Sequence, residues 1–199
     1  MTHIYCLLVL AMFLLVPSAS AAQLSFGAQL DLANEGDKAA MVAVAKEYLR
    51  GEQVERDCFE ARRWFKRGAE LGSVEAQFQT GLIIDNGVCG IADAEAAFGY
   101  YSSAAAQGHA AAQYHLGVLY QTGRAGTRDD EQAVAWFRKA VRSGEPLAYC
   151  GLALAYAKGD GVARDRKEAK KLAQRGITSR HQEAVELCSQ VIAEQRLGE

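Results

Sequence analysis

The sequence has no large excess of charge of either sign and very little proline. Its 22 Lys and Arg residues against 24 Asp and Glu residues give a formal net charge of -2. Proteins that bind nucleic acid or anionic lipid through their overall charge carry an excess of basic residues, so neither partner is favoured. With 50% hydrophobic residues, 23% charged residues and only two prolines, the composition excludes a disordered chain and fits a packed soluble fold.

Motifs for several kinds of chemistry are also missing. No cysteines stand in a C-x-x-C pair, and His109, His115 and His181 are scattered without the spacing of a zinc site. The motifs G-x-S-x-G, H-E-x-x-H, G-x-x-x-x-G-K-[ST] and G-x-G-x-x-G do not occur. We therefore predict no cofactor and no metal site. An enzyme is the less favoured class, although a dispersed catalytic site would leave no such motif.

The longest apolar run lies near the N-terminus. It covers residues 4–16, which is too short for a helix to cross a hydrocarbon core of about 30 Å. Pro17 and a stretch of small residues follow, with an A-x-A-like sequence at residues 19–21. This order predicts a secretory signal peptide over residues 1–21, cleaved near Ala21. We expect the mature chain to be periplasmic or secreted and to contain no membrane span.

A period of 36 residues runs through the rest of the chain. The registers that return at this spacing are Ala40, Ala76, Ala112, Ala148 and Ala184; Gly51, Gly87, Gly123 and Gly159; and Asp57, Asp93, Asp129 and Asp165. Such a period is the signature of a repeat protein, whose exposed ends need capping elements. We predict four units over residues 39–74, 75–110, 111–146 and 147–182. A capping helix over residues 22–38 precedes them, and another over residues 183–199 follows them.

Each unit has the pattern of two helices. In the clearest copy, apolar residues at helical spacing predict a first helix from about Ala112 to Thr122, ended by Gly123. A second helix is predicted to begin near Asp129, because its carboxylate can accept hydrogen bonds from the free amides of the first turn. Small residues in the first helices leave room for a bulky ring of the partner helix: Ala45, Gly81, Gly117 and Ala153.

The repeated pattern resembles the Sel-1-like repeat family, a relative of the tetratricopeptide repeat. Residues 112–120 read A-Q-Y-H-L-G-V-L-Y and residues 133–140 read A-V-A-W-F-R-K-A, and the resemblance covers about residues 36–190. It implies an all-α fold, a right-handed α-solenoid of helix-turn-helix units whose first helices line a concave surface. It also implies a role in holding proteins together. With the signal peptide, it indicates an exported bacterial member of the family.

A second stripe on the first helices would face the groove of such a stack. The predicted partner-binding residues are Phe78, Leu82, Asp85, Tyr114, Val118, Gln121, Leu154 and Lys158. The floor of this groove is mostly apolar, which suits a protein or peptide ligand with apolar anchors. The alternative is that these side chains only pack between adjacent repeats, because apolar stripes on helices usually belong to the core.

Four cysteines remain after removal of the signal peptide: Cys58, Cys89, Cys150 and Cys188. An even number in an exported chain permits two disulfides, and the sequence alone leaves three pairings open. We favour Cys58 with Cys89, on the same edge of adjacent units, and Cys150 with Cys188, on first helices of neighbouring units. Buried free thiols are the alternative.

Three functions remain open at this point. The first is a scaffold that binds a protein or peptide in the groove, expected to be a monomer because both ends of the stack are capped. The second is an envelope accessory protein that binds peptidoglycan or joins a complex of the flagellar-motor type. The third is the β-lactamase-like or penicillin-binding activity linked to cysteine-rich relatives. It is disfavoured because no serine has a lysine three residues later.

Overall fold

The computed structural model describes residues 24–197, and every regular element in this range is a helix. The ten helices are α1 (Phe26–Asn34), α2 (Lys38–Arg50), α3 (Cys58–Glu70), α4 (Val74–Asp85), α5 (Ala94–Ala106), α6 (Ala110–Thr122), α7 (Asp130–Arg142), α8 (Pro146–Lys158), α9 (Arg166–Ile177) and α10 (Gln182–Glu194). Over this described range, no helix has the length and apolar character needed to cross a membrane. The predicted signal peptide lies outside the described residues.

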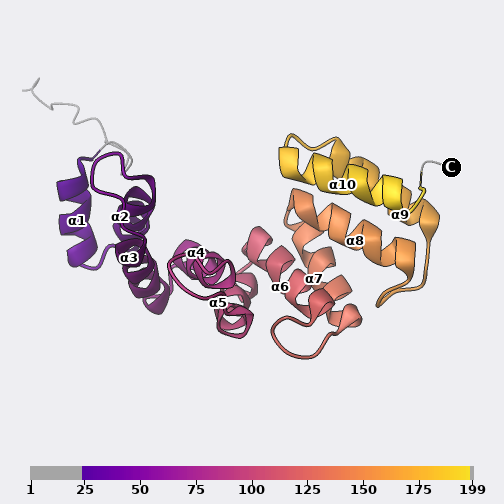
Figure 1. Cartoon of the computed structure of the whole chain (residues 1–199), viewed down its shortest axis with the longest axis horizontal. Coiled ribbons are helices and arrows are strands. Elements are labelled where there is room, and N and C mark those ends of the chain that lie inside the picture. Colours follow the sequence, from indigo (N-terminus) through magenta and orange to yellow (C-terminus); the bar gives the residue numbers. More distant parts are fainter. Residues whose placement is uncertain (1–23, 198–199) are drawn as a thin grey trace, which may run out of the picture.

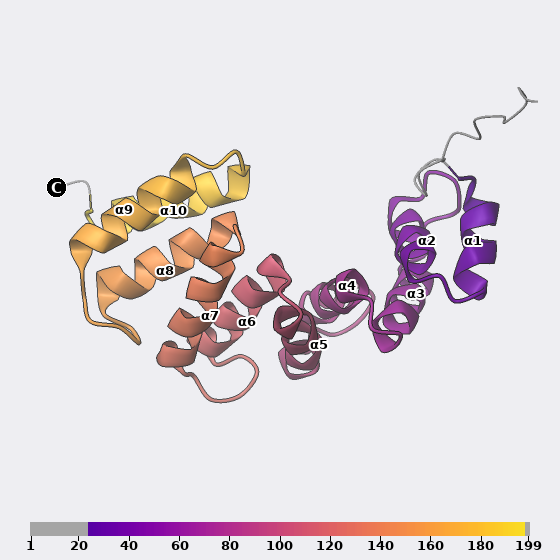
Figure 2. The same cartoon turned by 180° about the vertical axis from the view of Figure 1, so that it is seen from behind.

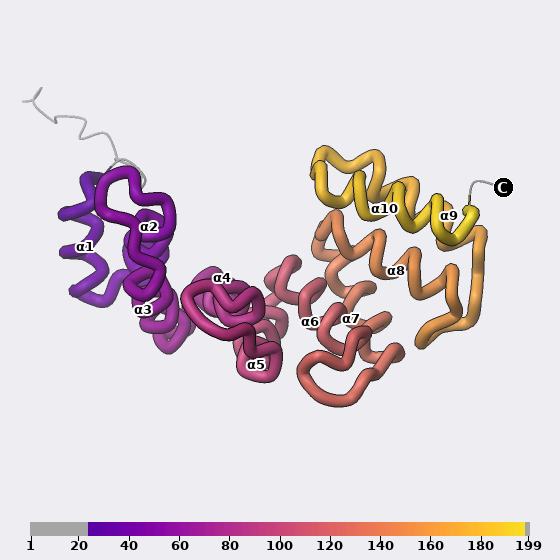
Figure 3. The backbone as a smooth tube through the Cα atoms, in the orientation of Figure 1, coloured from indigo at the N-terminus to yellow at the C-terminus, as the bar shows by residue number. Residues whose placement is uncertain are grey.

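The helices form successive hairpins that stack along an arc (Figure 1). The pairs are α2 with α3, α4 with α5, α6 with α7 and α8 with α9, while α1 packs on α2 and α10 packs on both α8 and α9. The tube in Figure 3 shows the same hairpin returning along the chain, and the view from behind in Figure 2 shows the same order. The N-terminal and C-terminal helices form the two arms, with α4 toward the open side of the arc and α5 toward its outer side.

Residues at fixed positions of the repeat start and stop the helices. The aspartates of the predicted register are the N-caps of the second helices: Asp57, Asp93, Asp129 and Asp165. In α7, for example, Asp129 accepts a hydrogen bond from the amide of Gln132 at 2.9 Å. The helix α6 begins at Ala110, two residues before its predicted start, because the ring of His109 accepts a hydrogen bond from the amide of Ala112. It ends at Gly123, whose φ of 69° is the left-handed conformation that glycine adopts readily.

Two glycines in the first helices receive aromatic rings from the second helices, as the sequence predicts. The fully buried ring of Tyr101 lies so close to Gly81 that an added Cβ would stand 2.8 Å from its Cδ1 and Cε1 atoms. The ring of Phe137 has the same relation to Gly117, at 2.7 Å, and also touches Gly151 of the following unit. Each ring therefore occupies space that a missing side chain leaves open, which fixes how closely the helices pack.

The four cysteines of the described chain form the two predicted disulfides. Cys58, at the start of α3, pairs with Cys89 in the loop between α4 and α5, with 5.8 Å between their Cα atoms. Cys150 of α8 pairs with Cys188 of α10, with 4.8 Å between their Cα atoms. The second pair is buried in the core. It therefore joins the C-terminal helix covalently to the last full unit.

Candidate partner-binding surface

Four of the predicted groove residues are half-buried apolar side chains on three consecutive first helices. They are Leu82 of α4, Tyr114 and Val118 of α6, and Leu154 of α8. We call this set the apolar floor. Each side chain packs on a core cluster with one side and keeps part of its surface open to solvent.

Tyr114 is the aromatic member of the apolar floor. Its ring centroid is 5.3 Å from that of His115 and 5.9 Å from that of Phe137. Burial raises the pKa of Tyr114 to about 12, and the negative charges of Glu183 and Glu145 add to this effect. The phenol is therefore neutral at physiological pH and can serve as both donor and acceptor at the edge of an apolar surface.

His115 adds a second ring beside Tyr114 on α6. It stacks on Tyr101, with 5.1 Å between the ring centroids and 16° between the planes. Burial lowers the pKa of His115, and the nearby negative charge of Asp85 offsets part of this shift. Because the ordinary pKa of histidine is about 6.5, a lowered value means that the imidazole is neutral at pH 7. The imidazole of His115 therefore adds no positive charge beside Tyr114.

Phe78 is packed inside the molecule and is not open to a partner. Only 9% of its surface is exposed. Its ring stacks on His109 with 4.4 Å between centroids and lies 6.1 Å from the ring of Tyr101. Its ring also lies 5.8 Å from the ring of His115 on α6, so this side chain belongs to the packing between adjacent repeats, the alternative stated for the stripe.

Asp85 is also buried, with 7% of its surface exposed. The guanidinium of Arg124, in the loop between α6 and α7, donates to both of its carboxylate oxygens at 2.8 and 3.0 Å. The hydroxyl of Tyr101 donates to the same carboxylate at 3.4 Å, and burial raises the pKa of that phenol above its ordinary value. Asp85 therefore ties one repeat to the next and is not free to contact a ligand.

The remaining two predicted residues flank the apolar floor. Gln121 of α6 is half-buried and Lys158 of α8 is exposed. Cys150, which holds the same register as Phe78 and Tyr114, is buried in its disulfide. The open surface is therefore narrower than the stripe predicted from sequence, and it consists of the apolar floor with these two polar neighbours.

A polar cluster joins α2, α4 and the turn before α6, and the sequence analysis did not find it. The ammonium of Lys46 lies 2.8 Å from Glu75 Oε1, and His109 Nε2 lies 3.5 Å from Glu75 Oε2. Gln79 donates to the same carboxylate at 3.0 Å. The contact with His109, followed by those with Lys46 and Gln79, lowers the pKa of Glu75 to about 2. Lys46 lies 29 residues before Glu75 and His109 lies 34 residues after it. Only the stacking of the repeats brings the three together, so no local sequence pattern marks them.

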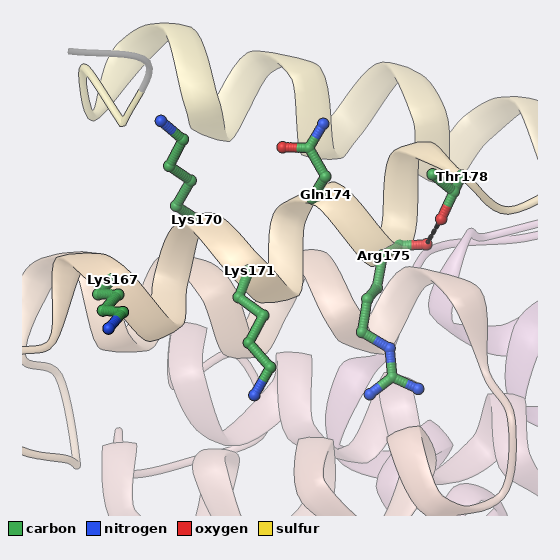
Figure 4. A pocket seen from close by; sticks show the side chains of 6 residues that line it. All are labelled: Lys167, Lys170, Lys171, Gln174, Arg175 and Thr178. Atoms are coloured by element: carbon green, nitrogen blue, oxygen red, sulfur yellow. Dashed lines mark hydrogen bonds between the residues drawn. The ribbon is translucent and has the colours of Figure 1, made fainter.

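A separate group of basic side chains lies along α9. Figure 4 shows the side chains that line a pocket there: Lys167, Lys170, Lys171, Gln174, Arg175 and Thr178. Lys171 is paired with Glu168 at 3.2 Å, and the guanidinium of Arg175 lies 4.9 Å from the ring centroid of Tyr149. Lys170 and Gln174 point to one side of the helix, while Lys171 and Arg175 point to the other (Figure 4). Five of these residues belong to α9 and Thr178 is its C-cap, so this surface shares no residue with the apolar floor.

A capped stack of helical hairpins with an open apolar surface defines the class of the protein, an α-solenoid repeat protein. The family follows from the sequence of the units. The family model described as Sel1 repeat matches residues 38–73, 74–109, 110–145 and 146–181, each beginning one residue before the predicted unit. The chain therefore belongs to the Sel1 repeat family, whose members are generally non-catalytic protein-interaction scaffolds.

Solved structures of bacterial proteins share this architecture. The chain is 29% identical to c5321, described as a protective antigen present in uropathogenic Escherichia coli strains with an SLR fold. That match has a TM-score of 0.78 and covers 88% of this chain but 37% of the antigen chain. A Sel1 repeat protein from Oxalobacter formigenes is 24% identical with a TM-score of 0.76, covering 90% of this chain and 73% of its own. Helicobacter pylori cysteine rich protein B is 20% identical with a TM-score of 0.50, covering 69% and 98%. Among curated proteins, none matches the sequence closely enough to count as a relative.

Proposed function

We propose that this protein is an exported bacterial scaffold that binds a partner protein or peptide on the apolar floor. The observation that carries the proposal is the partly open apolar surface of Leu82, Tyr114, Val118 and Leu154 across α4, α6 and α8. A partner helix or extended segment could place apolar side chains on this surface, with Gln121 and Lys158 available for polar contacts at its border.

The packing of the floor supports a binding role. A flexible surface must be ordered when a ligand binds, which weakens affinity. Here Tyr114 is held between His115 and Phe137, and the helix below it is fixed by the ring of Phe137 against Gly117. The surface is thus already in the conformation that a ligand would meet.

The disulfides support export. Disulfides persist in oxidising compartments such as the periplasm and the cell exterior, and are rare in the cytosol. All four cysteines in the described part of the chain are paired, which hints at an extracytoplasmic location. Together with the predicted signal peptide, this favours a periplasmic or secreted protein.

The test is affinity capture from an envelope extract with the mature chain, residues 22–199, as bait. The matched bait carries Leu82→Lys, Val118→Lys and Leu154→Lys. Lysine keeps an aliphatic stem on the helix and can hold its ammonium in water, so these half-buried positions tolerate it. A third bait carries Leu71→Lys, at an exposed apolar position outside the floor. All three must show equal helicity by circular dichroism.

The expected result is a protein retained by the unmodified bait and by Leu71→Lys but lost from the floor variant. In calorimetric titration, the purified partner should bind the floor variant at least about tenfold more weakly than it binds the unmodified chain. Changes at central interface residues commonly weaken binding by this much. Equal retention by all three baits would refute the proposal. Sedimentation of the unmodified chain with peptidoglycan sacculi, without any such protein, would instead support a cell-wall accessory function.

A further inference from the structure

Large exposed apolar side chains flank the disulfide between Cys58 and Cys89. Among the described residues, five large hydrophobic side chains are exposed, and three of them lie within two residues of a cysteine of this disulfide: Phe59 at 68%, Val88 at 40% and Ile91 at 94%. Phe59 is in the first turn of α3, and the other two are in the loop between α4 and α5. We call these three residues the edge patch. Single exposed apolar residues are ordinary, whereas a cluster marks an interaction site.

The disulfide between Cys58 and Cys89 holds the two parts of the edge patch together. Cys58 precedes Phe59, and Cys89 follows Val88, with 5.8 Å between the two Cα atoms. The loop is further fixed by backbone hydrogen bonds, from the amide of Val88 to the carbonyl of Ile83 at 2.9 Å and from that of Asp93 to Ile84 at 3.0 Å. The patch is therefore exposed without being loose, as a pre-organised binding surface requires.

The other units of the same chain show that the fold does not need apolar residues at these positions. At the 36-residue period, the positions equivalent to Phe59 hold Glu95, Glu131 and Lys167. Those equivalent to Val88 hold Glu52, Arg124 and Asp160, and those equivalent to Ile91 hold Glu55, Thr127 and Ala163. Every equivalent of Phe59 and Val88 is charged. The apolar side chains thus occur only where the disulfide brings the two segments together, and packing of the repeat does not explain them.

An unpaired positive charge lies beside the edge patch. Arg62 is one helical turn after Phe59 on α3, and its Nη1 atom lies 3.5 Å from the place that a Cβ at Gly90 would take. Within the described residues it makes no hydrogen bond or ion pair, whereas the adjacent Arg63 is paired with Glu60 at 3.0 Å. A free guanidinium next to apolar side chains complements a carboxylate that follows or precedes an apolar residue.

The size of the patch indicates the kind of occupant. Three such side chains expose on the order of 300 Å², while each partner of a stable dimer buries about 800 Å². The edge patch is therefore too small to hold a second copy of this chain by itself and is the size of a site for a short segment. We propose that it docks a short acidic segment of another protein that carries a bulky apolar anchor, with the anchor against Phe59 and Ile91 and a carboxylate on Arg62.

The probe is a random library of twelve-residue peptides, selected on the immobilised mature chain with its disulfides intact. Parallel selections use Phe59→Ser/Ile91→Ser and, as the matched control, Leu71→Ser, which changes another exposed apolar residue next to α3. The mutated side chains are exposed, so the variants should fold, which circular dichroism checks. The expected result is a consensus with one large apolar residue and neighbouring Asp or Glu. It should be enriched on the unmodified chain and the control but not on the double variant.

A labelled peptide of that consensus then gives affinities by fluorescence anisotropy. Arg62→Glu should weaken binding at least about tenfold, and high salt should weaken binding to the unmodified chain. Val118→Lys, on the apolar floor, should leave the affinity unchanged, so that failure here and failure of the floor are distinguishable. The proposal is overturned if the double variant selects the same peptides, or if the consensus lacks acidic residues. Patch-dependent sedimentation with phosphatidylglycerol vesicles would also overturn it and make the patch a lipid-binding surface.

Discussion

Replacement of Gly117 by alanine tests the close packing that positions the apolar floor. In an ordinary helix, Gly→Ala stabilises by about 1 kcal/mol because alanine restricts the unfolded chain and favours the helix. At Gly117, however, the new Cβ would stand 2.7 Å from Cδ1 and Cε1 of Phe137, where carbon atoms normally keep about 3.5–4.0 Å. The expected sign of the effect is therefore reversed.

The ring of Phe137 has little room to move away. It is fully buried, and on the following unit it lies against Gly151, where an added Cβ would stand 2.9 Å from Cε1 and Cζ. Overpacking of this kind costs about 1–3 kcal/mol. After subtraction of the helix gain of about 1 kcal/mol, Gly117→Ala should lower the free energy of unfolding by about 1 kcal/mol.

Gly99→Ala is the matched control, because Gly99 is an exposed helical glycine with no atom within 4 Å of the added Cβ. It should stabilise the protein by about 1 kcal/mol, so the two variants should differ by about 2 kcal/mol. Urea unfolding followed by circular dichroism measures both. Equal stabilisation by the two substitutions would refute the reasoning, since it would mean that the ring of Phe137 does not depend on the space at Gly117.

Three further predictions concern the ties between repeats. The double variant Cys150→Ala/Cys188→Ala should lose up to about 4 kcal/mol, because the bond closes a loop over a sequence separation of 38 residues; unchanged urea unfolding would contradict this. The pKa of Glu75 is lowered from 4.5 to about 2 in the folded state, so the stability that it contributes is present above pH 4.5 and is lost as the pH falls toward 2. Glu75→Gln should flatten the dependence of the free energy of unfolding on pH in this range. An identical pH dependence would count against the cluster. Arg124→Ala should lower the free energy of unfolding by about 2–3 kcal/mol, because it leaves the buried carboxylate of Asp85 without its partner. Asp85→Asn should lower it by only about 1–2 kcal/mol, because the half-exposed guanidinium of Arg124 stays in contact with water. A larger loss of thermal stability in Asp85→Asn than in Arg124→Ala would contradict this assignment.

The periodic sequence predicts the repeat architecture well because its signals are local or strictly periodic. An aspartate at each second-helix start satisfies amides within three residues. Glycines such as Gly81 and Gly117 meet rings from the next helix at a fixed register. The starts of helices are less exact, since His109 caps α6 through a ring nitrogen and so moves the start to Ala110.

The open surface is harder to predict because burial depends on neighbours far along the chain. Asp85 is covered by Arg124, 39 residues later, and Arg124 stands at a loop position with a different residue in every other unit. Phe78 is covered by Tyr101 of its own hairpin and by His109 and His115, the N-cap and a residue of α6 in the next hairpin. The edge patch has a signal that comparison of the four units reveals, because Val88 takes a position that is charged in the other three.

The most direct test of the account is site-specific photo-crosslinking from the apolar floor. The photo-reactive residue p-benzoyl-phenylalanine replaces Tyr114 or Leu82 on the floor, or the exposed Leu71 outside it as a control, in the full chain expressed with its own N-terminus. If the floor is the partner-binding surface, irradiation of intact cells should give the same protein adduct from Tyr114 and Leu82 and none from Leu71. Adducts from Leu71 alone, with none from either floor position, would contradict the account.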